Sequence, residues 1–400
     1  MRLNGREQTR KNRGAIMAIL WRTSALAQRH AEIGGELEDW NGMGTAWFYD
    51  HTPERAKADY EAIRTKAGLM DVSGLKKVHV VGEDAAYVID RVTTRNVEKI
   101  GVGRATYAAM LDERGLFVDD CVIYHIAVNS WMVVHGTGTG MEQLTKVAAA
   151  KNCAVIMDDD LHDMSLQGPV AVDFLEKHVA GIRDLAYFGI MNTKLFGKNV
   201  MISRTGYTGE RGYEIFVAAK DAVHVWDNIL SDGESMGIRP TQFSTLDMLR
   251  IESYLLFYPG DNSETFPFED GTPAGDSLWE LGLEFVVSPG KEGFIGSENH
   301  YAMEGKERFK IYGVQLTGDA MDQMEMFARV HHEGKDVGVI TYGLSSELNG
   351  YSVAIARLDP SVASPGTALT VVQPDGTELS ATAEEMPFYD KEKLIRSAKG

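Results

Sequence analysis

A run near the middle of the chain combines closely spaced glycines with acidic and aromatic side chains. Its sequence is Arg204-Thr-Gly-Tyr-Thr-Gly-Glu-Arg-Gly-Tyr-Glu-Ile-Phe-Val217, and β-rich stretches flank the three glycines. The pattern predicts a strand, a tight glycine turn and a second strand, with Tyr207, Glu210 and Glu214 close together. Glu214 follows Gly212, where a flat ligand can approach the backbone, and its carboxylate can accept two parallel hydrogen bonds. The run favours a site for a planar NH–C–NH2 edge such as that of a pterin, although an ordinary hairpin with exposed acids fits the same residues.

A second segment, Tyr107–Val122, carries the other chemically distinctive residues. It predicts a strand, a turn at 112–115 and a second strand, which brings Tyr107 near the consecutive acids Asp119 and Asp120. Because side chains alternate along a strand, the two acids face opposite ways, and at most one points into a given site. An aspartate inside a strand is unfavourable unless it has a partner. The segment therefore offers one candidate for a buried catalytic acid, or else a strand-end aspartate that bonds a turn.

The composition of the 400-residue chain indicates a globular protein of two or three domains. Its apolar fraction is 44%, its charged fraction is 24% and its net charge is −18. This acidic balance argues against nucleic acid and against an anionic membrane surface as partners. The two cysteines predict free, buried thiols, which fit a cytoplasmic location, and no spacing of His, Cys, Asp and Glu predicts a metal site. No stretch reaches the length of a membrane span, and residues 1–22 are expected to be a disordered leader.

Helices and antiparallel strands are both expected around the two segments. The predicted helices span 23–33, 53–67, 83–92, 141–151, 222–231 and 241–254. The predicted strands span 76–81, 106–111, 121–125, 131–135, 154–157, 165–168, 199–203 and 213–217. A glycine-rich loop with four aromatics is expected at 40–49, and a long acidic loop at 261–276. This mixture predicts an α+β fold rather than a regular series of βαβ units.

Short strands predominate in the C-terminal part of the chain. They are predicted at 311–316, 326–331, 336–342, 351–358 and 368–372, with turn residues between them. Such a series is typical of a small antiparallel barrel or sandwich. With a boundary near Gly305, we expect a body of several subdomains with antiparallel sheets at 23–305, followed by a C-terminal β-barrel at 306–400.

One glycine-rich segment imitates a dinucleotide-binding unit. Residues 131–140 predict a strand that runs into a Gly-Thr-Gly-Thr-Gly turn and a helix, followed by a strand and three acids. This order is that of a Rossmann unit. However, the glycines follow G-x-G-x-G rather than G-x-G-x-x-G, and no parallel βαβ series surrounds them. A solvated loop is the alternative interpretation.

Several short motifs, taken in order, resemble those of the aminomethyltransferase family. Besides the two segments above, the motifs are Ala67–Ser73, Leu166–Pro169, Asp247–Glu252, Phe294–Glu298 and Gly350–Arg357. Each is weak alone, but their common order makes the resemblance specific. The family includes the T-protein of glycine cleavage, the folate domains of dimethylglycine and sarcosine dehydrogenases, and tetrahydrofolate-dependent demethylases. The resemblance implies a folate-binding α+β body, a small β-barrel after it, and tetrahydrofolate as the cofactor.

The resemblance also implies roles for particular residues. Asp120 looks like the catalytic acid near the reactive folate nitrogens, with Tyr107 beside it, because the family's Tyr-to-Asp spacing falls on the second acid. A carboxylate there can stabilise the positive charge that develops as a one-carbon unit moves to a folate nitrogen, and can take up the released proton. The residues assigned to the cofactor site on the same grounds are Glu214, Tyr207, Gln167 and Arg357.

The chain departs from the glycine-cleavage T-protein mainly on the expected substrate side. Leu246 stands where that protein has an arginine, and the bulky Tyr254 replaces a small residue. The lost cation indicates a donor with a different carboxylate contact, or without a carboxylate. A sulfonium or a methylated ammonium would suit an aromatic cage, and an aryl methyl ether is also compatible. The expected substrate pocket consists of Trp47, Tyr49 and Tyr254, with ordinary core packing as the alternative.

The expected function is therefore tetrahydrofolate-dependent transfer of a methyl or other one-carbon unit from a small methylated donor, which makes the protein a demethylase. The alternatives are an aminomethyltransferase of the glycine-cleavage type and a non-catalytic folate-binding protein of the same fold. The expected partner is the small-molecule donor. The sequence is compatible with a homo-oligomer and does not set the number of subunits.

Overall fold

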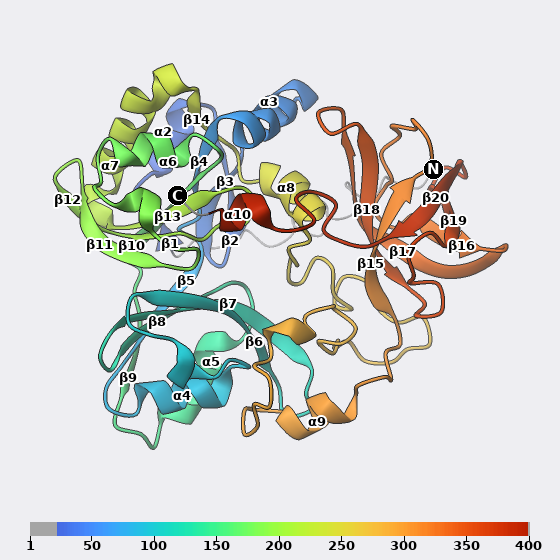
Figure 1. Ribbon diagram of the computed structural model, residues 1–400, viewed down its shortest axis with the longest axis horizontal. Helices are drawn as coiled ribbons and strands as arrows, with labels where there is room; N and C mark the ends of the chain where they lie inside the picture. The colour runs from blue at the N-terminus through green and yellow to red at the C-terminus, as the bar shows by residue number, and fades with distance from the viewer. Residues whose placement is uncertain (1–21, 399–400) are drawn as a thin grey trace.

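The structure is a computed structural model that describes residues 22–398. Three lobes surround the short central helix α8 (Thr245–Ser253), as Figure 1 shows: a six-stranded sheet with its helices, a five-stranded sheet with its helices, and a closed barrel. The prediction of an α+β fold with antiparallel sheets followed by a C-terminal barrel is confirmed. The expected leader lies outside the described residues except for Arg22, which begins the first strand.

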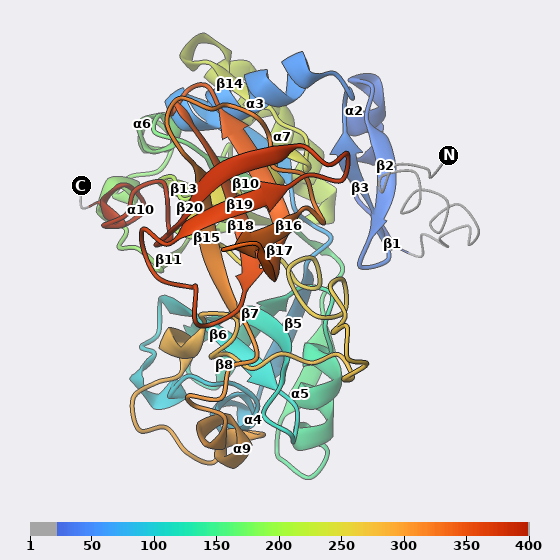
Figure 2. The same ribbon diagram turned by 90° about the vertical axis from the view of Figure 1, so that its right-hand side faces the viewer.

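A small three-stranded sheet stands at the edge of the molecule beside helix α2 (Figure 2). Its elements are β1 (Arg22–Thr23), α2 (Ala27–Glu32), β2 (Glu36–Trp40) and β3 (Met43–Phe48). The prediction of a loop at 40–49 was wrong, because Asn41 and Gly42 form a two-residue hairpin turn. Both residues have positive φ, at 56° and 82°, as the favoured hairpin turns require.

The six-stranded sheet carries the central glycine turn. Its order is β11 (Ile190–Leu195), β12 (Lys198–Ser203), β13 (Gly212–Ala218), β10 (Leu161–Gln167), β4 (Ala67–Asp71) and β14 (Ile238–Pro240). Helices α2, α6 (Ala171–Glu176) and α7 (Ala219–Gly233) pack on one face around Tyr213, Ile215 and Trp226. Helix α3 (Pro53–Thr65) begins at a Thr52 cap and packs beside β4. The opposite face of this sheet is turned toward the five-stranded sheet.

The five-stranded sheet is antiparallel throughout. Its order is β6 (Arg104–Leu111), β7 (Phe117–Ala127), β8 (Ser130–His135), β5 (Lys76–Val81) and β9 (Ala154–Met157). Helices α4 (Ala85–Val92) and α5 (Gly140–Ala148) cover its outer face. A dinucleotide unit needs parallel strands, whereas β9 pairs with β5 antiparallel, so the fold excludes that interpretation.

The barrel closes in the order β15 (Lys310–Leu316), β18 (Tyr351–Leu358), β17 (Lys335–Ser346), β16 (Arg329–His332), β19 (Ala368–Val372) and β20 (Glu378–Glu384). Five of the six strands were predicted, with shifted ends, and β20 was missed. After β20 the chain returns to the body, where α10 (Leu394–Ser397) lies near α8 (Figure 1). The remaining helical elements are α9 (Ser297–Ala302) and the 3-10 turns η1 (Val97–Lys99), η2 (Ile182–Asp184), η3 (Glu234–Met236) and η4 (Glu284–Val286).

The acidic loop at 261–276 is anchored at both ends by buried ion pairs. Asp261 Oδ2 lies 2.6 Å from Arg250 Nη1, and Asp276 Oδ1 lies 3.5 Å from Arg357 Nη2. Since Arg250 belongs to α8 and Arg357 to the barrel, the loop ties the body to the barrel. Across residues 22–398, no helix is long and apolar enough to cross a membrane.

Candidate functional site

Asp120 and Tyr107 lie together on the inner face of the five-stranded sheet, which is the face turned toward the six-stranded sheet. The Tyr107 hydroxyl donates a hydrogen bond of 2.6 Å to Asp120 Oδ2. Burial and the neighbouring charge of Asp119 raise the pKa of Asp120 to about 7, and the Tyr107 hydrogen bond opposes this shift. Near neutral pH the Asp120 carboxyl group can therefore either hold or release a proton.

Asp119 points to the opposite face of the same strand, as the alternation of side chains predicts. Its Oδ2 atom lies 2.8 Å from His135 Nδ1 and accepts a hydrogen bond of 3.2 Å from the Gly140 backbone. A Cβ atom added to Gly138 would stand 2.6 Å from the Asp119 carboxyl carbon. The glycine-rich turn after β8 thus accommodates the buried Asp119 carboxylate rather than a dinucleotide.

Glu214 lies on the facing sheet, where the strand register places it opposite Ser165 and Ser203. Its Oε2 atom accepts hydrogen bonds from Tyr124 at 3.2 Å and from the Thr205 hydroxyl. Tyr124 belongs to β7, so the first of these bonds joins the two sheets. Burial raises the pKa of Glu214. Both hydrogen bonds that Glu214 receives from residues 22–398 end on Oε2, which leaves Oε1 for a ligand.

Tyr207 lies in the glycine turn, close enough to Asp120 for the charge of that carboxylate to affect the pKa of the Tyr207 phenol. Its hydroxyl donates to the backbone carbonyls of Leu255 and Leu256, at 3.1 and 2.5 Å. Burial raises the pKa values of Tyr207 and Tyr107, and the charge of Asp120 contributes to both shifts. The two phenols therefore stay protonated at neutral pH, and both lie near Asp120.

Gln167 supports this turn from the end of β10. Its Nε2 donates to the Thr205 carbonyl, and its Oε1 accepts from the Thr208 hydroxyl, both at 3.1 Å. A Cβ atom on Gly206 or Gly212 would stand 2.1 or 2.0 Å from Gln167 Oε1, so the close approach requires glycine at both positions. The contacts of Gln167 indicate that it holds the glycine turn in place.

Arg357 lies at the junction between the barrel and the body, where several groups contact its guanidinium. Its guanidinium lies 3.5 Å from the centroid of the Phe309 ring, and Nη1 donates to the Asp261 carbonyl at 3.2 Å. Asp276 pairs with the charge of the guanidinium, and the Phe309 ring packs against it. They give Arg357 a structural role and do not themselves place it beside Glu214 or Asp120.

Two of the three aromatics expected to line a substrate pocket belong to apolar clusters that also include Tyr207 or Tyr107. Trp47 packs on Phe243, with ring centroids 4.6 Å apart, and shares an apolar cluster with Tyr207. Tyr254 is packed against the cluster that also contains Tyr107. Trp47 and Tyr254 therefore belong to two different clusters.

Tyr49, the third aromatic, lies elsewhere. Its hydroxyl is 3.0 Å from His30 Nδ1, and His30 Nε2 is 3.0 Å from Asp71. The His30 ring also meets Trp226 edge-on, on the face of the six-stranded sheet that the helices cover. Tyr49 belongs to this buried network, and the structure does not bring it together with Trp47 and Tyr254.

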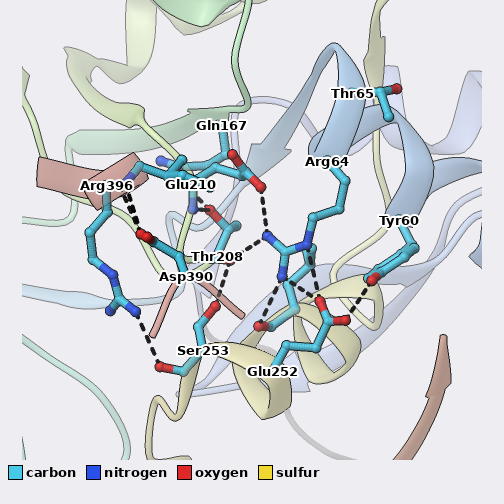
Figure 3. Close-up of polar contacts among 12 residues, drawn as sticks. Tyr60, Arg64, Thr65, Gln167, Thr208, Glu210, Glu252, Ser253, Asp390 and Arg396 are labelled. Atoms are coloured by element: carbon cyan, nitrogen blue, oxygen red, sulfur yellow. Dashed lines mark hydrogen bonds and ion pairs between the residues drawn. The ribbon is translucent and has the colours of Figure 1, made fainter. Parts of the chain in front are cut away.

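Glu210, which was expected close to Tyr207 and Glu214 in the turn, belongs to a buried ion-pair network (Figure 3). Arg64 Nη1 lies 2.9 Å from Glu210 Oε1, and Arg64 Nη2 lies 2.6 Å from Glu252 Oε2. Tyr60 from α3 and Tyr351 from the barrel each donate a hydrogen bond of 2.7 Å to Glu252 Oε1. The network joins α3, α8, the glycine turn and the barrel. The Glu210 carboxylate is paired with Arg64 in this network and so has a structural role.

Tyr124 and Thr205, both partners of Glu214, were missed from the sequence. A signal for Tyr124 was present, because it lies four residues after Asp120 on a strand and so shares its face. Among the described residues, no group of three or more His, Cys, Asp or Glu side chains is arranged to hold a metal ion.

Comparison with known proteins gives two family models that together span most of the chain. Residues 26–288 match the GCVT N-terminal domain, and residues 310–390 match the glycine cleavage T-protein C-terminal barrel domain. The aminomethyltransferase T of Bartonella henselae has the same fold, with a TM-score of 0.80 at 21% identity over 92% of this chain and 98% of that one.

Two relatives are similar in sequence over nearly their whole length. The heme-dependent oxidative N-demethylase gamma subunit of Ectopseudomonas mendocina is 54% identical, over 96% of this chain and 100% of that protein. The aminomethyltransferase of Thermotoga maritima is 30% identical, over 91% of this chain and 96% of that protein. The chain therefore belongs to the glycine cleavage T-protein (aminomethyltransferase) family.

Proposed function

We propose that this protein transfers a one-carbon unit from a small methylated donor to tetrahydrofolate, and that the donor is an N-methylated amine. The observation that supports the transfer most directly is the arrangement of two acids on facing sheets. Asp120, with a pKa near neutrality, is held by Tyr107 on one sheet, while Glu214 lies on the other. The first can exchange a proton during turnover, and the second can fix a planar ring.

The residues present fit a tetrahydropterin. A pterin offers N3–H and 2-amino donors on one edge, and Glu214 Oε1 is left to accept from such donors because its partners occupy Oε2. Tetrahydrofolate, when bound, supplies two nitrogen nucleophiles that accept the carbon. Glu214 would hold the pterin edge, and Asp120 and Tyr107 would lie toward the nitrogens that react.

Asp120 then has two tasks. In its ionised form it would stabilise the positive charge that develops on the transferred carbon, and it would take up the proton that is released during the transfer. Tyr107 fixes the carboxylate through Oδ2, and burial, together with the charge of Asp119, raises the pKa of Asp120 to about 7. Groups in such roles typically contribute about 10² to 10⁴ in rate.

The Ectopseudomonas relative favours an N-methyl donor over a sulfonium or an aryl ether. That protein is named as a subunit of an oxidative N-demethylase, and the 54% identity covers its full length. Two-electron oxidation of R2N–CH3 gives R2N⁺=CH2 or, after addition of water, R2NH and formaldehyde. Capture of the carbon releases the amine and a proton in the first case, and water in the second. The oxidant must come from elsewhere, so we propose that this chain also works as a subunit beside an amine-oxidising partner.

The test follows the hydrogen atoms of the transferred carbon. The protein and tetrahydrofolate are incubated with the other subunits of the Ectopseudomonas enzyme and with CD3-labelled N-, S- and O-methyl donors, and the folate products are analysed by mass spectrometry. We expect product from N-methyl donors only, with two deuterium atoms retained and a rate above that without this chain. Retention of three would mean direct methyl transfer, and no acceleration over the spontaneous reaction would contradict the proposal.

A further inference from the structure

Asp163 on β10 is a buried acid whose two carboxylate oxygens have no hydrogen-bond partner. The residue is 0% exposed, and neither Oδ1 nor Oδ2 meets a donor among the described residues. Buried polar atoms are nearly always paired, because an unpaired one loses its hydration without compensation. An acid left in this state is accounted for if a ligand supplies the missing donors.

The strand register places Asp163 on the same face as Glu214. Asp163 lies opposite Phe216 on β13, and Ser165 lies opposite Glu214, so the two acids are diagonal neighbours on the face turned toward the five-stranded sheet. Phe216 packs with Tyr124 across the space between the sheets, at 5.5 Å between ring centroids. Asp163 is therefore directed into the same region that holds Glu214 and Tyr124.

A cation is nearby but does not satisfy the carboxylate. Lys77 on β5 is fully buried, and its Nζ donates to the Ser73 and Leu75 carbonyls at 2.6 and 2.8 Å. Its charge favours the ionised form of Asp163, whereas burial and the charge of Glu214 act in the opposite direction and raise the pKa of Asp163.

We propose that Asp163 is a second acid of the ligand site and binds, together with Glu214, the amino-pyrimidine edge of a tetrahydropterin. The edge presents donors at N3 and the 2-amino group and one acceptor at N1. An ionised carboxylate accepts from two of these donors, and a protonated one donates to N1 while it accepts from the 2-amino group. Two acids on one face of the sheet, one of which has no donor among residues 22–398, therefore match this edge. The inference rests on the proposed folate function, and it adds Asp163 as a residue that recognises the pterin ring.

The test compares wild type, Asp163→Asn and the exposed control Asp319→Asn in equilibrium binding of tetrahydrofolate by calorimetry, using the full chain. Because the acid contributes charge-assisted hydrogen bonds, we expect the Asn variant to bind about ten- to a hundredfold more weakly. The ligand-free variant should melt no lower than wild type, since an unpaired buried acid is removed. Asp163→Ser serves as a second variant if the Asn protein does not fold.

A second ligand separates ring recognition from a general effect. For 2-desamino-2-methyltetrahydrofolate, which lacks the amino donors, wild type and Asp163→Asn should bind within about threefold of each other. Equal affinity of both proteins for tetrahydrofolate, or a lower melting point with unchanged affinity, would overturn the role of Asp163 and leave the proposed function intact. Failure of wild type to bind tetrahydrofolate would overturn the proposed function and this inference with it.

Discussion

Asp119 and Asp120 are consecutive in the chain but belong to opposite faces of one strand. Asp119 is bound to His135 and the Gly140 backbone on the outer face, while Asp120 accepts a hydrogen bond from Tyr107 on the inner face. The charge of Asp119 nevertheless reaches Asp120 and helps to raise its pKa to about 7. The two acids thus have separate roles. Asp119, on the outer face, helps to raise the pKa of Asp120, whereas Asp120 faces the space between the two sheets.

Replacing Asp120 by asparagine should stop turnover without unfolding the protein or releasing the folate. The amide keeps the shape of the side chain but cannot take up a proton or offset a positive charge, so we expect turnover to fall about 10²- to 10⁴-fold. Product formation is measured by mass spectrometry and tetrahydrofolate affinity by calorimetry. If Asp120→Asn retains wild-type turnover, Asp120 is not the catalytic acid.

Asp119→Asn is the matched variant on the other face. It removes the partner of His135 and should lower the melting temperature, because it breaks a buried charge-assisted contact. It should retain turnover, but with the inflection of the pH–rate profile moved to lower pH, because the charge that raises the pKa of Asp120 is gone. An unmoved inflection would show that the Asp119 charge does not set the pKa of Asp120.

The raised pKa of Asp120 also predicts how stability changes with pH. The folded-state pKa of about 7 exceeds the unfolded value near 3.9, so the folded protein binds more protons than the unfolded chain between about pH 4 and 7. This group therefore lowers the free energy of unfolding as the pH rises through that window. We expect Asp120→Asn to gain in melting temperature over wild type from pH 4 to 7, with no further gain above. A constant difference across the window would contradict the shifted pKa.

Local patterns in the sequence predicted those contacts between candidate site residues that lie close together in the chain. Tyr107 and Asp120 share one hairpin, and period-2 alternation correctly separated Asp119 from Asp120. The Asn41-Gly42 hairpin carried an equally local signal that was overlooked in favour of a loop. Short strands at regular spacing predicted the barrel, of which only the sixth strand was missed. In the body they predicted the five-stranded sheet, but of the six-stranded sheet only β10, β12 and β13.

Long-range pairings explain what could not be predicted. Glu214 meets Tyr124 across 90 residues, and Arg64 meets Glu252 across 188, so no local pattern records either contact. Asp163 could be recognised only from the structure. There β10 lies between β13 and β4, and the two Asp163 carboxylate oxygens lack donors in the described part of the chain. The ion pair of Glu210 was not predicted for the same reason, because its partner Arg64 lies on a helix far away in the chain.

The buried Arg64 network should behave as one unit. Arg64→Met would leave Glu210 and Glu252 buried without their cation, and breaking such a pair typically costs about 3–5 kcal/mol. Urea unfolding measures the loss, and adding Glu210→Gln and Glu252→Gln to the variant should recover part of it. As a control, Arg29→Met breaks a solvent-exposed pair with Asp227 and should leave the urea midpoint nearly unchanged. An equally small effect of Arg64→Met would show that the network is not structural.

The close contact between Gly212 and Gln167 links turn geometry to ligand affinity. An alanine Cβ at position 212 would stand 2.0 Å from Gln167 Oε1, so the amide must move and lose its bonds to Thr205 and Thr208. Overpacking of this kind costs about 1–3 kcal/mol. The same turn carries Tyr207 and leads into Glu214, so tetrahydrofolate affinity should fall together with stability.

A double-mutant cycle tests this coupling. In a Gln167→Ala background the collision is absent, so Gly212→Ala should add a smaller loss than it causes alone. Gly101→Ala is the matched control, because a Cβ at Gly101 meets no atom within 4 Å and its φ lies outside the left-handed region. If Gly212→Ala costs as much with Gln167 as without it, the glycine is required by something other than this contact, and Gln167 does not hold the turn.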